Sequence, residues 1–195
     1  MTNRLAIAAA ITSALALAAC SREADGTANE AAADAVNAAE PAAAPQTMAL
    51  NGPDGRPVGT VTMSEDSNGV TIKVDASAIP AGTHGVHLHT TGLCEGPKFE
   101  SAGGHWNPAG KQHGRDNPMG AHLGDLANFE IGDAGTATTT FLVGGVTMSG
   151  AANALADADG TSLVVHAKAD DYKTDPSGDS GDRIACAVLA PATGG

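Results

Sequence analysis

From residue 47 onward, apolar and polar residues alternate in short segments that are separated by turn-forming residues. This period of two constrains the fold of the 195-residue chain most strongly, because it is typical of β-strands with one buried face. No helical pattern competes with it. We therefore expect an all-β fold, an eight-stranded antiparallel Greek-key β-barrel or sandwich, which buries short strands without open edges. The predicted strands lie near residues 47–51, 56–63, 69–76, 84–89, 127–131, 136–143, 162–167 and 183–189.

Residues 1–19 have the pattern of a secretory signal. Arg4 supplies a basic start, and the apolar run from Leu5 to Ala19 is too short for a comfortable transmembrane helix. The run ends in LAAC, which resembles a bacterial lipobox and implies that Cys20 is lipidated and becomes the mature N-terminus. The alternative is a plain signal peptide in which this cysteine is incidental. Because serine and not aspartate follows, we expect a periplasmic protein with its lipid in the outer membrane.

Residues 20–47 are predicted to be a disordered tether, and residues 48–195 the folded domain. The tether is rich in alanine and lacks the spaced large apolar residues that bury a helix face. About 27 flexible residues have an r.m.s. reach of roughly 30 Å, enough to hold a domain clear of a membrane. The domain contains 17 acidic and 8 basic residues, a net charge of −9 that argues against nucleic acid as a partner. We expect membrane contact through the lipid only.

The seven histidines all lie between residues 84 and 166. His87 and His89 are two apart on a predicted strand, so both side chains leave one face about 6 to 7 Å apart and can chelate one ion. Alone this pair is weak evidence of a metal, since the HxH pattern occurs on many strands without one. Two stretches with little strand signal, 90–126 and 168–182, are predicted to be long functional loops.

The loop 90–126 adds more residues of the types that bind zinc. Imidazoles and a carboxylate are zinc ligands, and a structural site is normally closed by four of them. A solvated histidine is the alternative for each one, but a bound zinc explains how a loop rich in Gly, Pro and Asn becomes ordered. Two four-coordinate metals need eight ligands and the chain offers seven, so one imidazole must serve both. The candidates are His87, His89, His105, His113, His122, Asp125 and His166.

Six motifs resemble, in order, the signatures of copper/zinc superoxide dismutase: GVHLH, AGGHWNP, KQHG, AHLGDL, LVVHAKADD and GDSGDRIACAVL. The resemblance covers essentially all of 48–190 and implies one copper and one zinc per chain. It makes Asp170 a carboxylate that links one copper histidine to one zinc histidine and fixes their ring orientation. The implied copper ligands are His87, His89, His105 and His166, and the implied zinc ligands are His105, His113, His122 and Asp125.

The chain has three cysteines, one directly after the predicted signal segment and two in the predicted domain. If Cys20 carries lipid, an even remainder in an oxidising periplasm suggests one disulfide. The alternative is two separate buried thiols. The resemblance pairs Cys94 with Cys186, and closing a loop of about 90 residues stabilises a domain by on the order of 4 kcal/mol in the chain-entropy description.

The resemblance places Arg183 at the mouth of the copper channel. There its charge attracts a small anion, and its guanidinium hydrogen-bonds that anion beside the metal. A salt-bridged strand residue is the alternative. An acidic domain repels superoxide at long range, so a local positive potential is needed, although Asp182 next to the arginine departs from the family pattern. Weaker candidates for the same field are Lys111, Lys168 and Lys173, and the remaining histidine, His84, is expected to be structural.

The function that the resemblance implies is superoxide dismutation by a redox-cycling copper beside a structural zinc, which protects the cell envelope. His105 and Arg183 are the implied catalytic residues, and His105 is expected to leave reduced copper, take a proton and deliver it to the second product. A copper or zinc buffer or chaperone on the same barrel is the alternative, but such a protein is expected to lack a copper ligand, the bridging histidine or the arginine. A zinc hydrolase has no use for the arginine. Dimerisation is common in the family, so a homodimer is one of the possible states of this protein.

Overall fold

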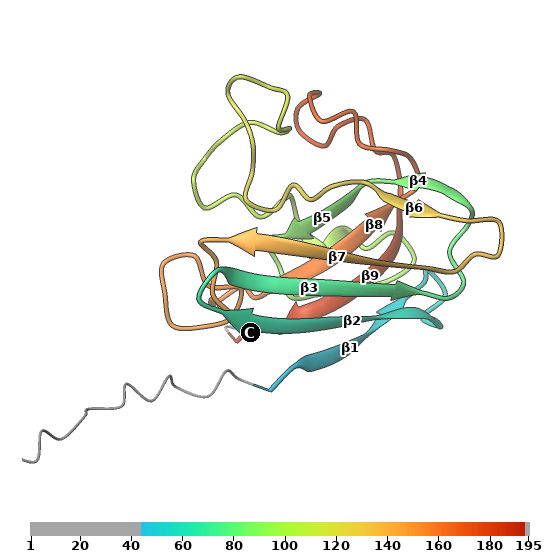
Figure 1. Cartoon of the computed structure of the whole chain (residues 1–195), viewed down its shortest axis with the longest axis horizontal. Helices are drawn as coiled ribbons and strands as arrows, with labels where there is room; N and C mark the ends of the chain where they lie inside the picture. The colour runs from blue at the N-terminus through green and yellow to red at the C-terminus, as the bar shows by residue number, and fades with distance from the viewer. Residues whose placement is uncertain (1–43, 194–195) are drawn as a thin grey trace, which may run out of the picture. The chain divides into compact units, whose positions relative to one another are not determined.

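A computed structural model describes residues 44–193 of the chain (Figure 1). The predicted signal segment, the predicted lipid attachment at Cys20 and most of the predicted tether lie outside these residues. Within the described range the only helical element is a 3₁₀ turn, η1, at Glu100–Ala102. No helix in that part of the chain is long and apolar enough to cross a membrane.

The strands form an antiparallel sheet that curls on itself (Figure 1). Seven strands follow one another in the order β5-β8-β9-β1-β2-β3-β7, and β4 and β6 form a separate pair. In Figure 1 the layer of β1, β2, β3 and β7 lies in front of the layer of β5, β8 and β9. The strands are β1 Gln46–Asn51, β2 Pro57–Asp66, β3 Gly69–Ala76, β4 Gly82–His84, β5 Val86–His89, β6 Phe129–Ile131, β7 Ala137–Gly144, β8 Thr161–His166 and β9 Arg183–Ala190.

The predicted all-β fold is confirmed, and one strand prediction is wrong. The segment 84–89, predicted as one strand, is divided at Gly85 into β4, which pairs with β6, and β5, which pairs with β8. At this glycine the backbone meets the loop 167–182: its N–H donates to the carbonyl of Lys168 at 2.8 Å. A Cβ there would lie 3.0 Å from the Cβ of Ser180. The break therefore comes from a contact with a distant loop, which raises the strand count from eight to nine.

The alternation of residues in the strands separates a core from a second buried face. Val86 and Leu88 of β5 point into the main hydrophobic cluster, together with Leu163 and Val165 of β8. Every residue of β5 and β8 is nevertheless buried, including those on the opposite face. The two long loops, 90–128 and 167–182, cover that opposite face. A polar site between sheet and loops is thereby shielded from solvent.

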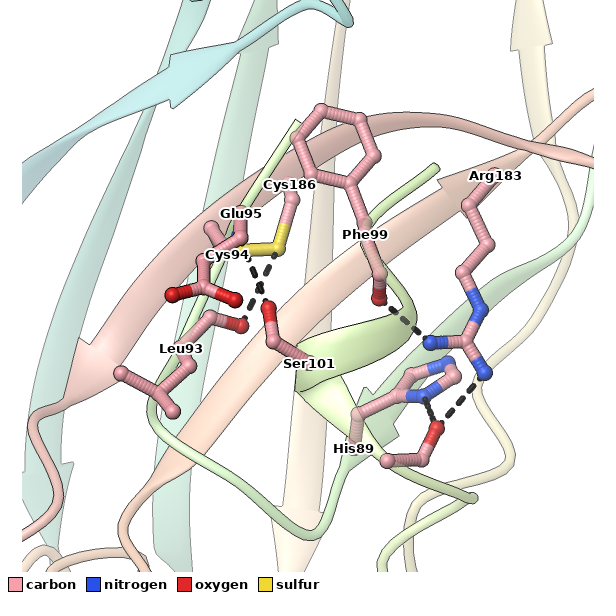
Figure 2. Close-up of a disulfide and its surroundings, with 9 residues drawn as sticks. His89, Leu93, Cys94, Glu95, Phe99, Ser101, Arg183 and Cys186 are labelled. Carbon is pink, nitrogen blue, oxygen red and sulfur yellow. Dashed lines mark hydrogen bonds between the residues drawn. A yellow bond between two sulfur atoms is a disulfide. The ribbon is translucent and has the colours of Figure 1, made fainter. Parts of the chain in front are cut away.

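A disulfide joins Cys94 to Cys186, as predicted (Figure 2). It connects the loop after β5 to the middle of β9, and the two Cα atoms are 5.7 Å apart. The second hydrophobic cluster surrounds it, with Phe99, Ala102 and Val164 as buried members. The first part of the long loop is thus held against the sheet by both a covalent bond and apolar packing.

Replacing both cysteines (Cys94→Ala/Cys186→Ala) should lower the free energy of unfolding by about 4 to 5 kcal/mol, because the unfolded chain regains the entropy of a long closed loop. Urea unfolding of the metal-free protein measures the loss. A reductant should produce a similar shift in the wild type and none in the double variant. A loss below about 1 kcal/mol would contradict the chain-entropy account.

Candidate metal centre

The loop 90–128 is placed by the free edge of β5. The N–H of Leu88 donates to the carbonyl of Gly124 at 2.9 Å, so the loop runs beside the strand as an extra partner. Only glycine allows this approach, since a Cβ at Gly124 would lie 2.6 Å from the carbonyl oxygen of Leu88. The loop residues that carry imidazole and carboxylate groups are brought over β5 in this way. Two isolated β-bridges result, His87 with Asp125 and His89 with His105.

Six histidines gather on the face of β5 opposite the core. The rings of His87 and His89 are 6.5 Å apart between centroids, as the spacing of alternate strand residues predicts. His166 ends β8, and its backbone pairs with that of Arg183 at the start of β9. The ring centroids of His87 and His166 lie 4.8 Å apart. The loop contributes the remaining members, His105, His113 and His122.

One ligand atom from each of His87, His89, His105 and His166 lies within 4.8 Å of the others. In each of these rings one nitrogen is buried and has no hydrogen-bond partner in the protein. A buried nitrogen without a partner is costly unless something else binds it. The unpartnered atoms are Nδ1 of His87 and Nε2 of His89, His105 and His166.

The second nitrogen of each of these rings faces an oxygen acceptor. Two acceptors are carboxylates: Asp170 lies 2.9 Å from His87 Nε2, and Asp125 lies 2.9 Å from His105 Nδ1. The other two are backbone carbonyls: that of Gly103 lies 3.0 Å from His89 Nδ1, and that of Gly181 lies 3.1 Å from His166 Nδ1. A carbonyl or carboxylate oxygen only accepts, so in a neutral ring the proton lies on the nitrogen that faces it. The unpartnered nitrogens then carry lone pairs. Four convergent imidazole lone pairs fit a divalent transition-metal ion such as copper.

Burial keeps these four rings neutral. Desolvation lowers the pKa of His105 to about 4 and that of His166 to about 3. It also lowers the pKa values of His87 and His89. At neutral pH the four nitrogens are therefore available to a metal without loss of a proton from the protein.

A second group of ligands surrounds Asp125. One oxygen of its carboxylate, Oδ1, lies 2.9 Å from Nδ1 of His105, 3.0 Å from Nδ1 of His113 and 3.0 Å from Nδ1 of His122. The other oxygen accepts the backbone N–H groups of Gly114 and His122, which fixes the carboxylate in the loop. Three imidazole nitrogens and a carboxylate oxygen are a donor set that suits zinc. His105 belongs to both groups, and a ligand atom of His87 also lies within 4.8 Å of those of His105, His113 and Asp125.

Asp170 connects the two groups through the outer nitrogens of their rings. Its Oδ2 lies 2.9 Å from Nε2 of His87, and its Oδ1 lies 2.9 Å from Nε2 of His113. Burial opposes the charge of the carboxylate, but hydrogen bonds from His113 and His87 hold the pKa of Asp170 well below its usual range. Asp125 behaves likewise: burial opposes its charge, and hydrogen bonds from His105 and His113 lower its pKa. Two ionised carboxylates therefore flank His113.

Arg183 is held by the backbone of the long loop (Figure 2). Its Nη1 donates to the carbonyl of Phe99 and its Nη2 to the carbonyl of Gly103, both at 2.6 Å. The Gly103 carbonyl also accepts from His89, so the arginine and a ring of the first ligand group share one acceptor. Desolvation lowers the pKa of Arg183, yet a guanidinium stays charged at neutral pH. A depression of about 510 Å³ beside it is lined by Pro53, Pro97, Lys98, Glu100, Gly181, Asp182, Arg183 and Ile184.

The three candidate lysines and the remaining histidine belong to neither ligand group. The aliphatic part of Lys168 lies next to Gly181, while Lys111 and Lys173 are exposed on the loops. His84 is buried outside both ligand groups: its Nδ1 lies 2.7 Å from the carbonyl of His166 and its Nε2 lies 2.9 Å from that of Pro80. This is the structural position expected for it.

Two residues near the site carry no signal in the sequence. Asn128 and Tyr172 hydrogen-bond to Asp170, and they lie 42 and 2 positions away from it along the chain. An asparagine beside a strand and a tyrosine in a loop have no pattern that marks such a role. Their contacts appear only once the loops are folded.

An antiparallel barrel with two adjoining groups of metal-binding side chains that share His105 defines a narrow class of metalloproteins. Within it, the sequence profile of copper/zinc superoxide dismutase matches residues 58–189, and the chain belongs to this family. The predicted family and enzyme class are confirmed, as are copper and zinc as cofactors.

Individual relatives agree with this assignment. The chain is 42% identical over 138 residues to superoxide dismutase [Cu-Zn] 2 of Aquifex aeolicus, covering 70% of this chain and 81% of that protein. It is 40% identical over 146 residues to superoxide dismutase [Cu-Zn] of Caulobacter vibrioides, with coverage of 73% and 84%. A crystal structure of a SOD-like protein from Bacillus subtilis matches with a TM-score of 0.70 and 38% identity, over 73% of this chain and 97% of that one.

Zinc binding should release about one proton per ion at pH 7. Burial alone would lower the pKa of His113, but hydrogen bonds with Asp125 and Asp170 raise it to about 9, so the metal-free ring is protonated at pH 7. A metal can take Nδ1 only after its proton leaves, whereas the carboxylates are already ionised and His105 is already neutral. Affinity should thus fall about tenfold for each pH unit below about 9.

Calorimetric titration with zinc in two buffers of different ionisation enthalpy measures this proton release. The difference between the two buffers should disappear as the pH rises above the pKa of His113. Heats at pH 7 that do not depend on the buffer would contradict a protonated ring between the two carboxylates.

Proposed function

We propose that this protein converts two superoxide anions and two protons into dioxygen and hydrogen peroxide. The observation that carries the proposal is the set of four buried imidazole nitrogens without partners, one of them on a histidine that also faces Asp125. Copper would be held by His87, His89, His105 and His166, and zinc by His105, His113, His122 and Asp125. Membership of the copper/zinc superoxide dismutase family supports this division of the ligands.

The protein supplies positioned protons and charges around the metals. Bound copper supplies the one-electron redox chemistry, alternately accepting and donating an electron. His105 is suited to proton delivery because its Nε2 has no partner in the protein, while Nδ1 stays on the side of Asp125. A proton placed on Nε2 can pass to the peroxide product. The proposed zinc, bound by Nδ1 and by Asp125, would keep the ring in place meanwhile.

Arg183 binds and orients the anion. The folded domain carries a net charge of −9, so an approaching superoxide is repelled until it comes close. The carbonyls of Phe99 and Gly103 hold the guanidinium in one position. The depression beside it also contains Lys98, but Glu100 and Asp182 offset part of that charge. We expect weaker electrostatic steering than in a site bordered by cations alone.

A metal buffer or chaperone without turnover is the competing function. The ligand set argues for catalysis, because every predicted ligand is present and lies in one of the two groups. A buffer also has no need of a fixed guanidinium next to the copper ligands. A zinc hydrolase would leave four unpartnered imidazoles and Arg183 without a role.

We further propose that the protein acts in the periplasm from a lipid anchor in the outer membrane, where it protects the cell envelope. The lipobox-like LAAC sequence before Ser21 supports this proposal. The Cys94–Cys186 disulfide is consistent with an oxidising compartment. In this arrangement Cys20 is lipidated, and the residues between it and β1, which begins at Gln46, form the tether.

Arg183→Ala should slow superoxide consumption at least tenfold and flatten its salt dependence, with one copper and one zinc per chain retained. Pulse radiolysis at several ionic strengths, with elemental analysis of the same sample, measures both quantities. Lys73→Ala is the matched control, because it removes one positive charge on β3, where Lys73 pairs with Asp75. Full metal content in the wild type without turnover would favour the buffer, and loss of copper from the arginine variant would contradict a steering role.

Cys20→Ser should abolish lipid attachment and move the protein from the membrane fraction to the soluble periplasmic fraction. Incorporation of labelled palmitate, followed by cell fractionation, tests this outcome. A Ser21→Asp variant should keep the lipid but shift the protein to the inner membrane. A Cys20→Ser protein that stays in the outer membrane would rule out the proposed anchor.

A further inference from the structure

Asn128 pairs with the main chain of Asp170 as a neighbouring strand would. Its side-chain oxygen accepts the N–H of Asp170 at 2.8 Å, and its side-chain nitrogen donates to the carbonyl of Asp170 at 2.9 Å. Asn128 lies directly before Phe129, the first residue of β6. One amide thus fastens the loop 167–182 to the barrel at the residue whose carboxylate reaches both ligand groups.

Tyr172 holds the same residue from the other side. Its N–H donates at 2.7 Å to Oδ1 of Asp170, the oxygen that also accepts from His113. Its hydroxyl accepts the N–H of Asn128 at 2.7 Å. The tyrosine and the asparagine are therefore bonded to each other as well as to Asp170, in a closed set of hydrogen bonds.

The tyrosine also contacts the loop that carries His113. The guanidinium of Arg115 lies 3.7 Å from the centre of the Tyr172 ring, a distance suited to a cation–π interaction. The N–H of Asp116 donates to the carbonyl of Tyr172 at 2.9 Å. The φ of Tyr172 is 60°, in the left-handed region that a bulky residue adopts only where its surroundings impose it.

We propose that Asn128 and Tyr172 are positioning residues for both metal sites and act through Asp170. The carboxylate accepts from Nε2 of His87 and Nε2 of His113 at once, and each bond directs the opposite nitrogen, Nδ1, toward a metal. A single carboxylate serves two imidazoles only while its main chain is fixed.

The link through Asp170 predicts an effect on both metal sites. Releasing the main chain of Asp170 weakens copper and zinc binding together, because one carboxylate loses its alignment with a ring in each group. This inference rests on the proposed assignment of His87 to copper and His113 to zinc. A residue that only stabilised the loop would change the thermal stability without changing the two rings.

The test compares the dissociation constants of copper and zinc, measured by competition with chelators, for the wild type, Asn128→Ala and Tyr172→Phe. Asn128→Ala should raise both constants roughly tenfold, within the range typical of residues that support metal ligands. Tyr172→Phe keeps the ring that Arg115 contacts and should raise both by a smaller factor. Asn153→Ala is the matched control: that side chain also donates to a backbone carbonyl, of Gly145, but in another loop.

Proton NMR of the zinc-loaded protein adds a direct view of the rings. The Nε2 protons of His87 and His113 are buried against Asp170, so they should exchange slowly in the wild type and measurably faster in Asn128→Ala. In an Asp170→Asn background, Asn128→Ala should cause no further loss of metal affinity, since residues that act through one another are not additive.

Unchanged affinities and exchange rates in Asn128→Ala would overturn the proposal, as would a loss confined to one metal. If that variant does not fold, Tyr172→Phe decides by the same readouts. A wild type that binds neither metal at these residues would instead refute the proposed function. The two failures are therefore distinguishable.

Discussion

Six imidazoles and two carboxylates are buried side by side over β5, and a buried polar atom without a partner destabilises the fold. Backbone carbonyls and the carboxylates of Asp125 and Asp170 satisfy one nitrogen in each of the four rings of the first group. The nitrogens that remain have no acceptor or donor within the described chain and point to a common space. The packing that buries the site therefore leaves one nitrogen of each of these four rings without a partner, and a bound metal would be that partner.

This constraint explains why the loops are fastened so closely to the sheet. The loop 90–128 bonds to the free edge of β5, and the disulfide holds its first part against β9. The carbonyl of Gly103 then accepts from both His89 and Arg183. A shift of this part of the loop would move a metal ligand and the anion-binding arginine together, so their relative position depends on one backbone segment.

The sequence was sufficient for the strands other than β4 and β5, because alternation is a local property. It was also sufficient for the shared face of His87 and His89, since two residues on a strand always leave the same side. It was not sufficient for the break at Gly85, which comes from contact with Lys168 and Ser180 far along the chain. The grouping of the loop histidines came from family resemblance, because spacing alone does not say how a long loop closes.

The two ligand groups are connected by two routes, one through His105 and one through Asp170. His105 joins them directly, with Nδ1 facing Asp125 and Nε2 facing the unpartnered nitrogens. Asp170 joins them through hydrogen bonds to His87 and His113, and this second route passes through a loop rather than through one ring. A metal on Nδ1 of His113 replaces the proton shared with Asp125 but leaves the Nε2 bond to Asp170 intact. Zinc would then make Nε2–H of His113 a stronger donor and so hold the carboxylate of Asp170 in place. The carboxylate would in turn keep His87 aligned. This alignment would persist even while His105, in its proposed role, carries a proton on Nε2.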